Sequence, residues 1–158
     1  MKKDVILKMP VVRLNIVPYA LARLSEDFLG SSNNYHPKTE IHIVNFYLLC
    51  VSIELGLKSI LLSKGYSKKK IKNFGHDLIK LVKEYNKINN LNLEQKVLNP
   101  IEKINPYFKN KSMEYFKDDF ILSILRGYKD LPSIKDLSFA ANQINKIIKK
   151  EKYFINIS

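Results

Sequence analysis

The chain has 158 residues, of which 46% are apolar, and this is the size and composition of a single globular domain. Its one cysteine, Cys50, excludes an internal disulfide and suits a reducing compartment, and because no targeting segment is recognised we expect a cytoplasmic protein. The formal net charge of +12 favours an anionic partner, but 24 of the 27 basic residues are lysines. An AT-rich genome also produces that bias, so charge alone does not identify the partner.

The first predicted helix begins near Pro18, which suits a first-turn position, and runs through "YALARLSEDFL" to Gly30, a natural C-terminal stop. The stretch "GSSNNYHP" that follows has the composition of a loop. His36 and His42 lie in or beside this loop, and we expect both on the surface.

The second predicted helix runs from about Thr39 to Lys64 and is apolar on most of its circumference, as expected of the central helix of a bundle. Residues 41–62 have about the 20 residues that a membrane span requires. Glu54 and Lys58 fall inside this stretch, where each would cost roughly 2.5–3.5 kcal/mol near mid-bilayer, so we expect no membrane partner. Cys50 in this apolar run is expected to be a buried thiol rather than a nucleophile.

Small residues recur on the same helix at spacings of 4, 3 and 4: Ser52, Gly56, Ser59 and Ser63. Such a stripe allows another helix to approach closely. It predicts a packing seam, either within the chain, which is the more common use, or between two chains of a dimer.

The segment after Gly65 predicts further helices. A short basic segment is either a turn or a helix capped by Ser67 and stopped at Gly75, and "HDLIKLVKEYNKI" predicts a third main helix with Asp77 near its positive end. "NLEQ" at residues 92–95 has the form of a capping box for a fourth helix, which Pro100 or Pro106 should end or kink.

The C-terminal third is less uniform. Residues 107–131 are read as either one helix or a loop with a helical end, whereas Ser133 and Asp136 form a capping pair for a final helix. With no repeat or linker, the sequence predicts one all-α domain over residues 1–158, a bundle of about five helices.

Two polar residues interrupt the apolar second helix. Glu54 and Lys58 are four residues apart, in the order that favours an ion pair on one helix face. They form either a solvated stripe or a partly buried pair, since their flanking residues are apolar. A chain reversal between Gly65 and Gly75 would bring His76 beside them, where it would cap the turn, bond Glu54 or contact an anion.

The segments "IELGLKSIL" (residues 53–61) and "GHDLIKL" (residues 75–81), with the glycine-ended helix at Gly65 between them, resemble the bacterial HEPN superfamily. The resemblance covers roughly residues 45–85, about a quarter of the chain. It implies a bundle of four or five helices, frequent homodimers, and roles in RNA cleavage or nucleotide binding, often in defence or toxin–antitoxin systems. Glu54, Lys58 and His76 match recurring polar positions of such bundles.

One feature of that superfamily is missing. Its ribonucleases carry an arginine followed four to six residues later by a histidine, but here Arg13, Arg23 and Arg126 are followed by "LNIVPYA", "LSEDFLG" and "GYKDLPS". We therefore assign no catalytic residue. An enzyme would need Arg126 and one of the three histidines to meet in space, with the histidine as general acid or base.

A basic run follows the second helix and is a candidate nucleic-acid patch: Lys68, Lys69, Lys70 and Lys72, with Tyr66 and Phe74 as stacking rings. Lysine runs are also commonly just solvated. Glu114 with the "KDD" that begins at Lys117 has carboxylates at metal-compatible spacing but no nearby histidine, so no metal or other cofactor is expected.

We expect a binding module for RNA, a nucleotide or a protein partner in a defence or toxin–antitoxin setting, and we expect it to form homodimers. The candidate polar network is Glu54, Lys58, His76 and Arg126. Two alternatives remain open at this stage: a metal-independent ribonuclease with non-standard Arg and His placement, and a structural or regulatory dimeric subunit.

Overall fold

A computed structural model describes residues 11–14, 16–38, 42–127, 129–151 and 153–157. The helices of this part of the chain are α1 (Ile16–Asn34), α2 (Ile43–Ser63), α3 (Lys68–Asn73), α4 (Leu78–Asn89), α5 (Gln95–Lys109), α6 (Asp118–Leu125) and α7 (Ile134–Ile148). Two short strands, β1 (Val11–Leu14) and β2 (Phe154–Ile157), pair antiparallel with Val11 opposite Ile157.

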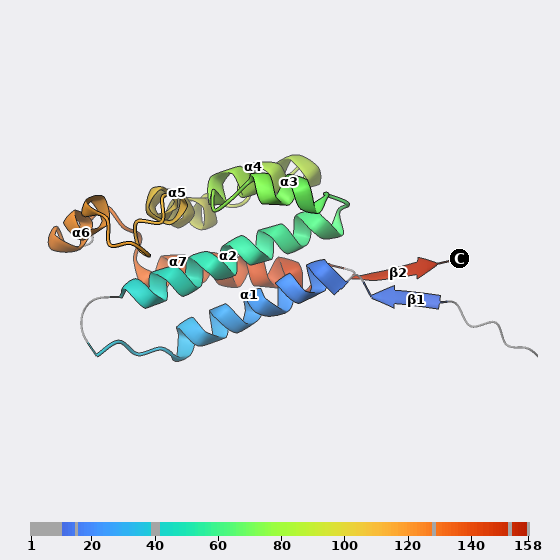
Figure 1. The fold of residues 1–158 in the computed structure, drawn as a ribbon, viewed down its shortest axis with the longest axis horizontal. Coiled ribbons are helices and arrows are strands. Elements are labelled where there is room, and N and C mark those ends of the chain that lie inside the picture. The colour runs from blue at the N-terminus through green and yellow to red at the C-terminus, as the bar shows by residue number, and fades with distance from the viewer. Residues whose placement is uncertain (1–10, 15, 39–41, 128, 152, 158) are drawn as a thin grey trace, which may run out of the picture.

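The all-α class is confirmed, whereas the number of helices is larger than predicted. The described residues contain seven helices rather than about five, because the short α3 and α6 are separate elements. The β1–β2 ribbon projects from one end of the bundle (Figure 1) and was not predicted, since its strands lie at opposite ends of the sequence.

The centre of the bundle is α2, which contacts α1, α3, α4, α5 and α7. Leu49, Ile53, Leu57, Ile60 and Leu61 on this helix are fully buried. Figure 1 shows α1 along one side of α2, the layer of α3, α4 and α5 along the other, and α7 behind α2, where it contacts α1, α2 and α5. Within the described residues, α2 is also the helix that is long and apolar enough to cross a membrane, and most of it is buried inside the bundle.

The small-residue stripe on α2 is used within the chain. A Cβ added to Gly56 would lie 2.8 Å from side-chain atoms of Ile144 and Ile148 on α7. Ser25 on α1 and Ser52 exchange hydrogen bonds, each hydroxyl donating to the other's backbone carbonyl at 2.7 and 2.8 Å. The stripe is therefore covered by α1 and α7, and the interpretation of it as a dimer seam is wrong.

The predicted caps Ser67 and Ser133 are confirmed, and Asp77, which was predicted only to lie near the positive end of its helix, is a cap as well. The hydroxyls of Ser67 and Ser133 and the carboxylate of Asp77 accept backbone N–H groups three residues later, at the starts of α3, α7 and α4. The predicted start of the second helix at Thr39 lies outside the described residues, and the described helix begins at Ile43.

Three predicted boundaries are wrong. Helix α1 continues past Gly30 to Asn34, and α5 starts from Glu94, whose side chain makes no capping bond, rather than from a capping box at residues 92–95. Helix α5 also continues through both Pro100 and Pro106. Its buried apolar face against α4 and α7 compensates for the backbone hydrogen bonds that the two prolines cannot make.

Candidate functional site

Glu54 lies in the middle of α2 and is the acidic centre of a three-residue network. The residue is only 6% exposed, and both of its carboxylate oxygens are engaged. Lys58 Nζ donates to Oε1 at 2.5 Å from one helical turn along, and His76 Nδ1 donates to Oε2 at 3.0 Å. The predicted proximity of these three side chains, and the shielding of Glu54, are confirmed.

The link between α2 and α4 places His76 in this network. Gly65 and Gly75 take positive φ angles of 90° and 57°, which a side chain would disfavour, and they lie on either side of the six residues of α3. The chain reverses here, so that α4 returns along α2. His76 directly precedes the N-cap of α4 and faces Glu54.

His76 connects the buried carboxylate to the surface, because 39% of its side chain is exposed while its Nδ1 points inward. The ring edge packs on Phe108 of α5, with ring centroids 5.6 Å apart at 80°, and Tyr47 packs on the same phenyl ring. A carboxylate that accepts the Nδ1 proton orients the imidazole, and in the neutral ring it leaves Nε2 as the acceptor for an outside group.

The negative charge of Glu54 affects two neighbouring side chains on α2. Burial, and secondarily this carboxylate, raise the pKa of the Cys50 thiol well above its usual value. Burial, Glu114 and Glu54, in that order, raise the pKa of Tyr47. Cys50 is therefore a buried core thiol, as predicted, and its raised pKa disfavours the thiolate.

A second acidic residue secures the start of α4 beside His76. Asp77 receives hydrogen bonds from the backbone N–H of Lys80 at 3.2 Å and from Asn105 Nδ2 at 3.3 Å, and an ion pair from Lys109 at 2.9 Å. Burial opposes its ionisation, but these bonds and the Lys109 charge together hold the pKa of Asp77 below its usual value. The bonds from Asn105 and Lys109 tie α4 to α5.

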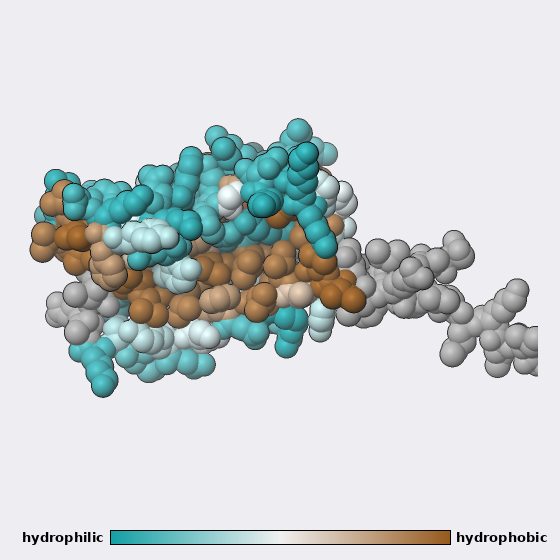
Figure 2. Space-filling view, in the orientation of Figure 1, coloured by the Kyte–Doolittle hydropathy of each residue, from teal (hydrophilic) through white to brown (hydrophobic). Residues whose placement is uncertain are grey.

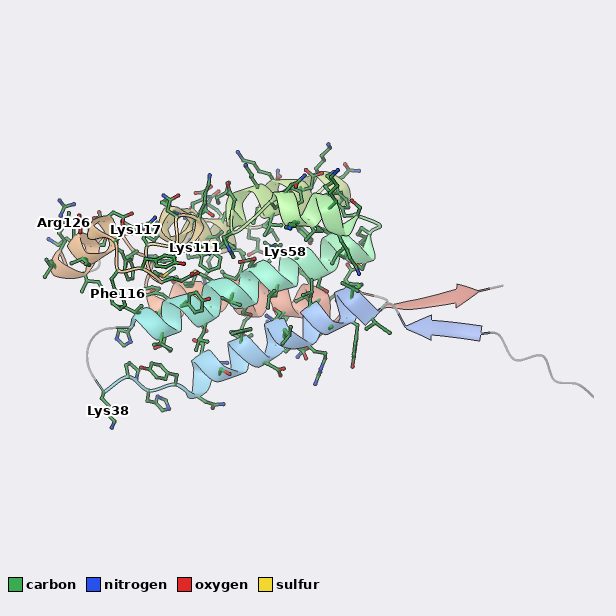
Figure 3. The ribbon with its side chains drawn as sticks, viewed as in Figure 1. Lys38, Lys58, Lys111, Phe116, Lys117 and Arg126 are labelled. Carbon is green, nitrogen blue, oxygen red and sulfur yellow. The ribbon has the colours of Figure 1, made fainter. Side chains whose placement is uncertain are left out.

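Arg126 does not belong to the network with which the sequence grouped it. It ends α6 and pairs with Asp130 at 3.7 Å. Figure 3 shows it at the outer end of the molecule, well away from Lys58. The hypothesis that Arg126 meets His76 in space to form an enzyme site is therefore wrong. His36 is exposed and His42 is half-buried at the N-cap of α2.

The lysines of the candidate nucleic-acid patch, Lys68, Lys69, Lys70 and Lys72, are exposed on α3, but its aromatic rings are engaged within the chain. The Tyr66 hydroxyl donates to Glu84 at 2.6 Å, and Lys70 Nζ lies 4.0 Å from the centre of the Tyr66 ring while also pairing with Glu84. Phe74 is half-buried against the core. Lys68, Lys69 and Lys72 are thus available to a ligand, whereas Lys70 and the two predicted stacking rings are engaged within the chain.

Sequence reasoning missed a second group of cations and rings, in the turn between α5 and α6. Tyr115 and Phe116 are exposed there beside Lys111 and Lys117, and both Lys111 and Phe116 have positive φ angles. Figure 3 shows Lys111, Phe116 and Lys117 at this end of the bundle. The alternation of basic and aromatic residues in "KNKSMEYFKDD" was the available signal.

A cleft of about 360 Å³ lies between α5 and the start of α7, away from this network. Its charged lining residues are Lys96, Glu102, Lys103 and Asp136. Because opposite charges balance there, the cleft does not favour an anion or a cation. Within the described residues no three metal-ligating side chains gather in one place.

Comparisons of the chain with protein-family models, curated proteins and solved structures give no match.

Proposed function

We propose that this protein binds a phosphate-bearing ligand of the RNA or nucleotide class on the layer formed by α3, α4 and α5. The observation that carries the proposal is the distribution of charge. Residues 64–111 contain twelve lysines against four acidic residues, so that less than a third of the chain holds +8 of the net charge of +12. This layer is the largely hydrophilic upper part of the molecule in Figure 2.

The lysines of α3 are the part of this layer that is open to a ligand. Lys68, Lys69 and Lys72 are exposed, and among the described residues they have no ion-pair partner. Cations of this kind bind a phosphate backbone by releasing its counterions, which produces affinity without sequence preference. Lysine ammonium groups act as point charges rather than bidentate donors, which again favours recognition of charge over base identity.

His76 lies at the edge of this basic layer, between α3 and α4, and the buried Glu54 carboxylate fixes its ring. Its outer nitrogen is placed to bond a group of the bound ligand. The HEPN resemblance extends the proposal to a defence or toxin–antitoxin setting.

Salt titration of binding to a labelled single-stranded RNA tests the proposal. We expect log K to fall linearly with log salt, and replacing Lys68, Lys69 and Lys72 with Gln should reduce the slope by about 2, since each phosphate contact on a single strand contributes roughly 0.7. The control removes three exposed lysines from α7 and its C-terminal end, Lys135, Lys146 and Lys149, and should leave the slope nearly unchanged. Failure of the wild type to bind even at low salt would exclude nucleic acid.

A second candidate, RNA cleavage at His76, rests on the orientation of the imidazole by Glu54. In the neutral ring with its proton on Nδ1, the outer nitrogen is an acceptor, which is the arrangement of a general base. An RNA degradation assay of the wild type and His76→Ala, without metal, decides the question. Equal inactivity of the two proteins would remove the enzyme interpretation and leave binding.

A further inference from the structure

Helix α1 carries two parallel lines of residues at the spacing of helix–helix seams. One line is buried in the bundle: Pro18, Ala22, Ser25, Leu29 and Ser32. The other line has the same 4, 3, 4 spacing and is entirely apolar: Val17, Leu21, Leu24 and Phe28. Leu24 is 45% exposed, and the other three side chains are partly exposed. Among the described residues, other helices cover the first line of α1 and no element covers the second.

Helix α2 has the same property on its outer side. Spacings of 4, 3, 4, 3 and 4 connect Val44, Leu48, Val51, Leu55, Lys58 and Leu62, all of them partly or largely exposed. Five of the six are apolar, and the exception, Lys58, is held by Glu54. Repeats of this spacing, close to 3.5 residues, are the pattern by which helices pack lengthwise against one another.

The two open lines form one continuous surface, because α1 and α2 lie side by side along their lengths (Figure 1). Figure 2 shows this surface as a hydrophobic band that runs along most of the bundle. We call it the α1–α2 face and define it by eight residues: Val17, Leu21, Leu24, Phe28, Val44, Leu48, Val51 and Leu55.

We propose that the α1–α2 face is the contact surface for a second copy of the chain, related to the first by a two-fold axis. A two-fold contact uses the same patch on both copies, so one apolar face with a regular seam pattern is sufficient. In such a dimer, α1 and α2 of the two copies pack together as a four-helix layer, and both apolar lines are covered.

The distribution of charge selects this face over the rest of the surface. Two copies at +12 each repel, and a stable contact must keep their cations apart. Over α1 and α2 the charged residues are Arg23, Glu26, Asp27, Glu54 and Lys58, a net charge of −1. The lysine-rich layer of α3, α4 and α5 lies on another side of α2, so the dimer would keep it open to a ligand.

The size of the face is also sufficient. At about 1.5 Å per residue the 19 residues of α1 extend roughly 28 Å, and two neighbouring helices are roughly 20 Å wide. Each copy would contribute roughly 560 Å² and the pair roughly 1,100 Å², above the approximate 1,000 Å² that a specific contact needs. This inference does not depend on the nature of the anionic ligand.

Sedimentation equilibrium of the full chain tests the proposal. We expect the wild type to have twice the 18.4 kDa mass of one chain. Leu24→Glu and Leu48→Glu, which bring charge onto the face, should each weaken association at least about tenfold, because the carboxylates would have to be desolvated. Leu125→Glu on α6 is the matched control, since Leu125 is 76% exposed and apart from the face.

Circular dichroism must show a folded α-helical protein for each variant, and Leu24→Ser replaces any glutamate variant that does not fold. A monomeric wild type would overturn the proposal, as would equal masses for the face variants and the control. A monomer that pellets with anionic lipid vesicles would overturn it in favour of a membrane surface.

Discussion

Replacing Lys58 with Met tests whether the Glu54 network behaves as a buried or an exposed group. Methionine keeps most of the apolar stem of lysine and removes its charge. Glu54 is 6% exposed, so it would lose one of two partners without gaining free access to water. His76 would remain on its second oxygen at 3.0 Å.

The expected cost lies between two limits. Exposed ion pairs contribute no more than about 1 kcal/mol, whereas a buried charge left without a partner costs about 3–5 kcal/mol. Lys58 is 14% exposed by side chain, and Glu54 retains His76, so water and the imidazole recover part of the loss. We therefore expect Lys58→Met to lower the free energy of unfolding by about 2–3 kcal/mol.

Urea unfolding of four proteins makes the measurement: the wild type, Lys58→Met, Glu54→Gln and the double variant. The double variant should be more stable than Lys58→Met alone, because it leaves no buried charge, with a coupling of at least about 1 kcal/mol. Arg23→Met is the control, since it breaks an exposed pair with Glu26 and should cost under about 1 kcal/mol. If Lys58→Met behaves like Arg23→Met, the network is a surface feature and the reasoning about Glu54 is wrong.

Three other changes follow from local geometry and are measured by denaturant unfolding. Gly56→Ala should destabilise by about 1–3 kcal/mol, because its Cβ would meet α7 side chains at 2.8 Å, whereas Gly30→Ala, with nothing within 4 Å, should stabilise by up to about 1 kcal/mol. The lowered pKa of Asp77 in the folded state adds stability above its unfolded pKa of about 3.9, and this is lost as pH falls through the folded value. Asp77→Asn should therefore cost more at neutral pH than near pH 2, and an equal cost at both would contradict the ion pair with Lys109. Ser133→Ala should cost about 1 kcal/mol through the lost cap of α7, and no change would mean that water replaces it.

The parts of the fold that were predicted correctly depend on neighbours in sequence. Ser67 and Ser133 cap helices three residues away, and the order of Glu54 before Lys58 favours a pair one turn apart. His76 was placed correctly because a reversal between two glycines is also a local event. The apolar circumference of α2 correctly predicted its central position, since burial must cover every side of such a helix.

Contacts between segments that are distant in the sequence could not be predicted from it. Helix α1 continues beyond Gly30 because Asn45 of α2 donates a hydrogen bond to the Ser32 carbonyl at 3.0 Å. A glycine inside a helix destabilises it by only about 1 kcal/mol, which such tertiary contacts outweigh. The β1–β2 pairing joins residues 140 to 146 positions apart, and no local sequence pattern predicts it.

By itself the sequence established the helical class, the capped starts of α3 and α7, and the Glu54, Lys58 and His76 group, because i, i+3 and i+4 geometry and a two-glycine reversal are local. Only the tertiary structure decided which apolar lines are covered. In the structure, Gly56 and its serine neighbours pack against α1 and α7, and Arg126 lies away from the Glu54 network. No described element covers the α1–α2 face (Figure 2). The physical reason is that the spacing of a helix specifies its faces but not the element that packs on each, which depends on the path of the whole chain.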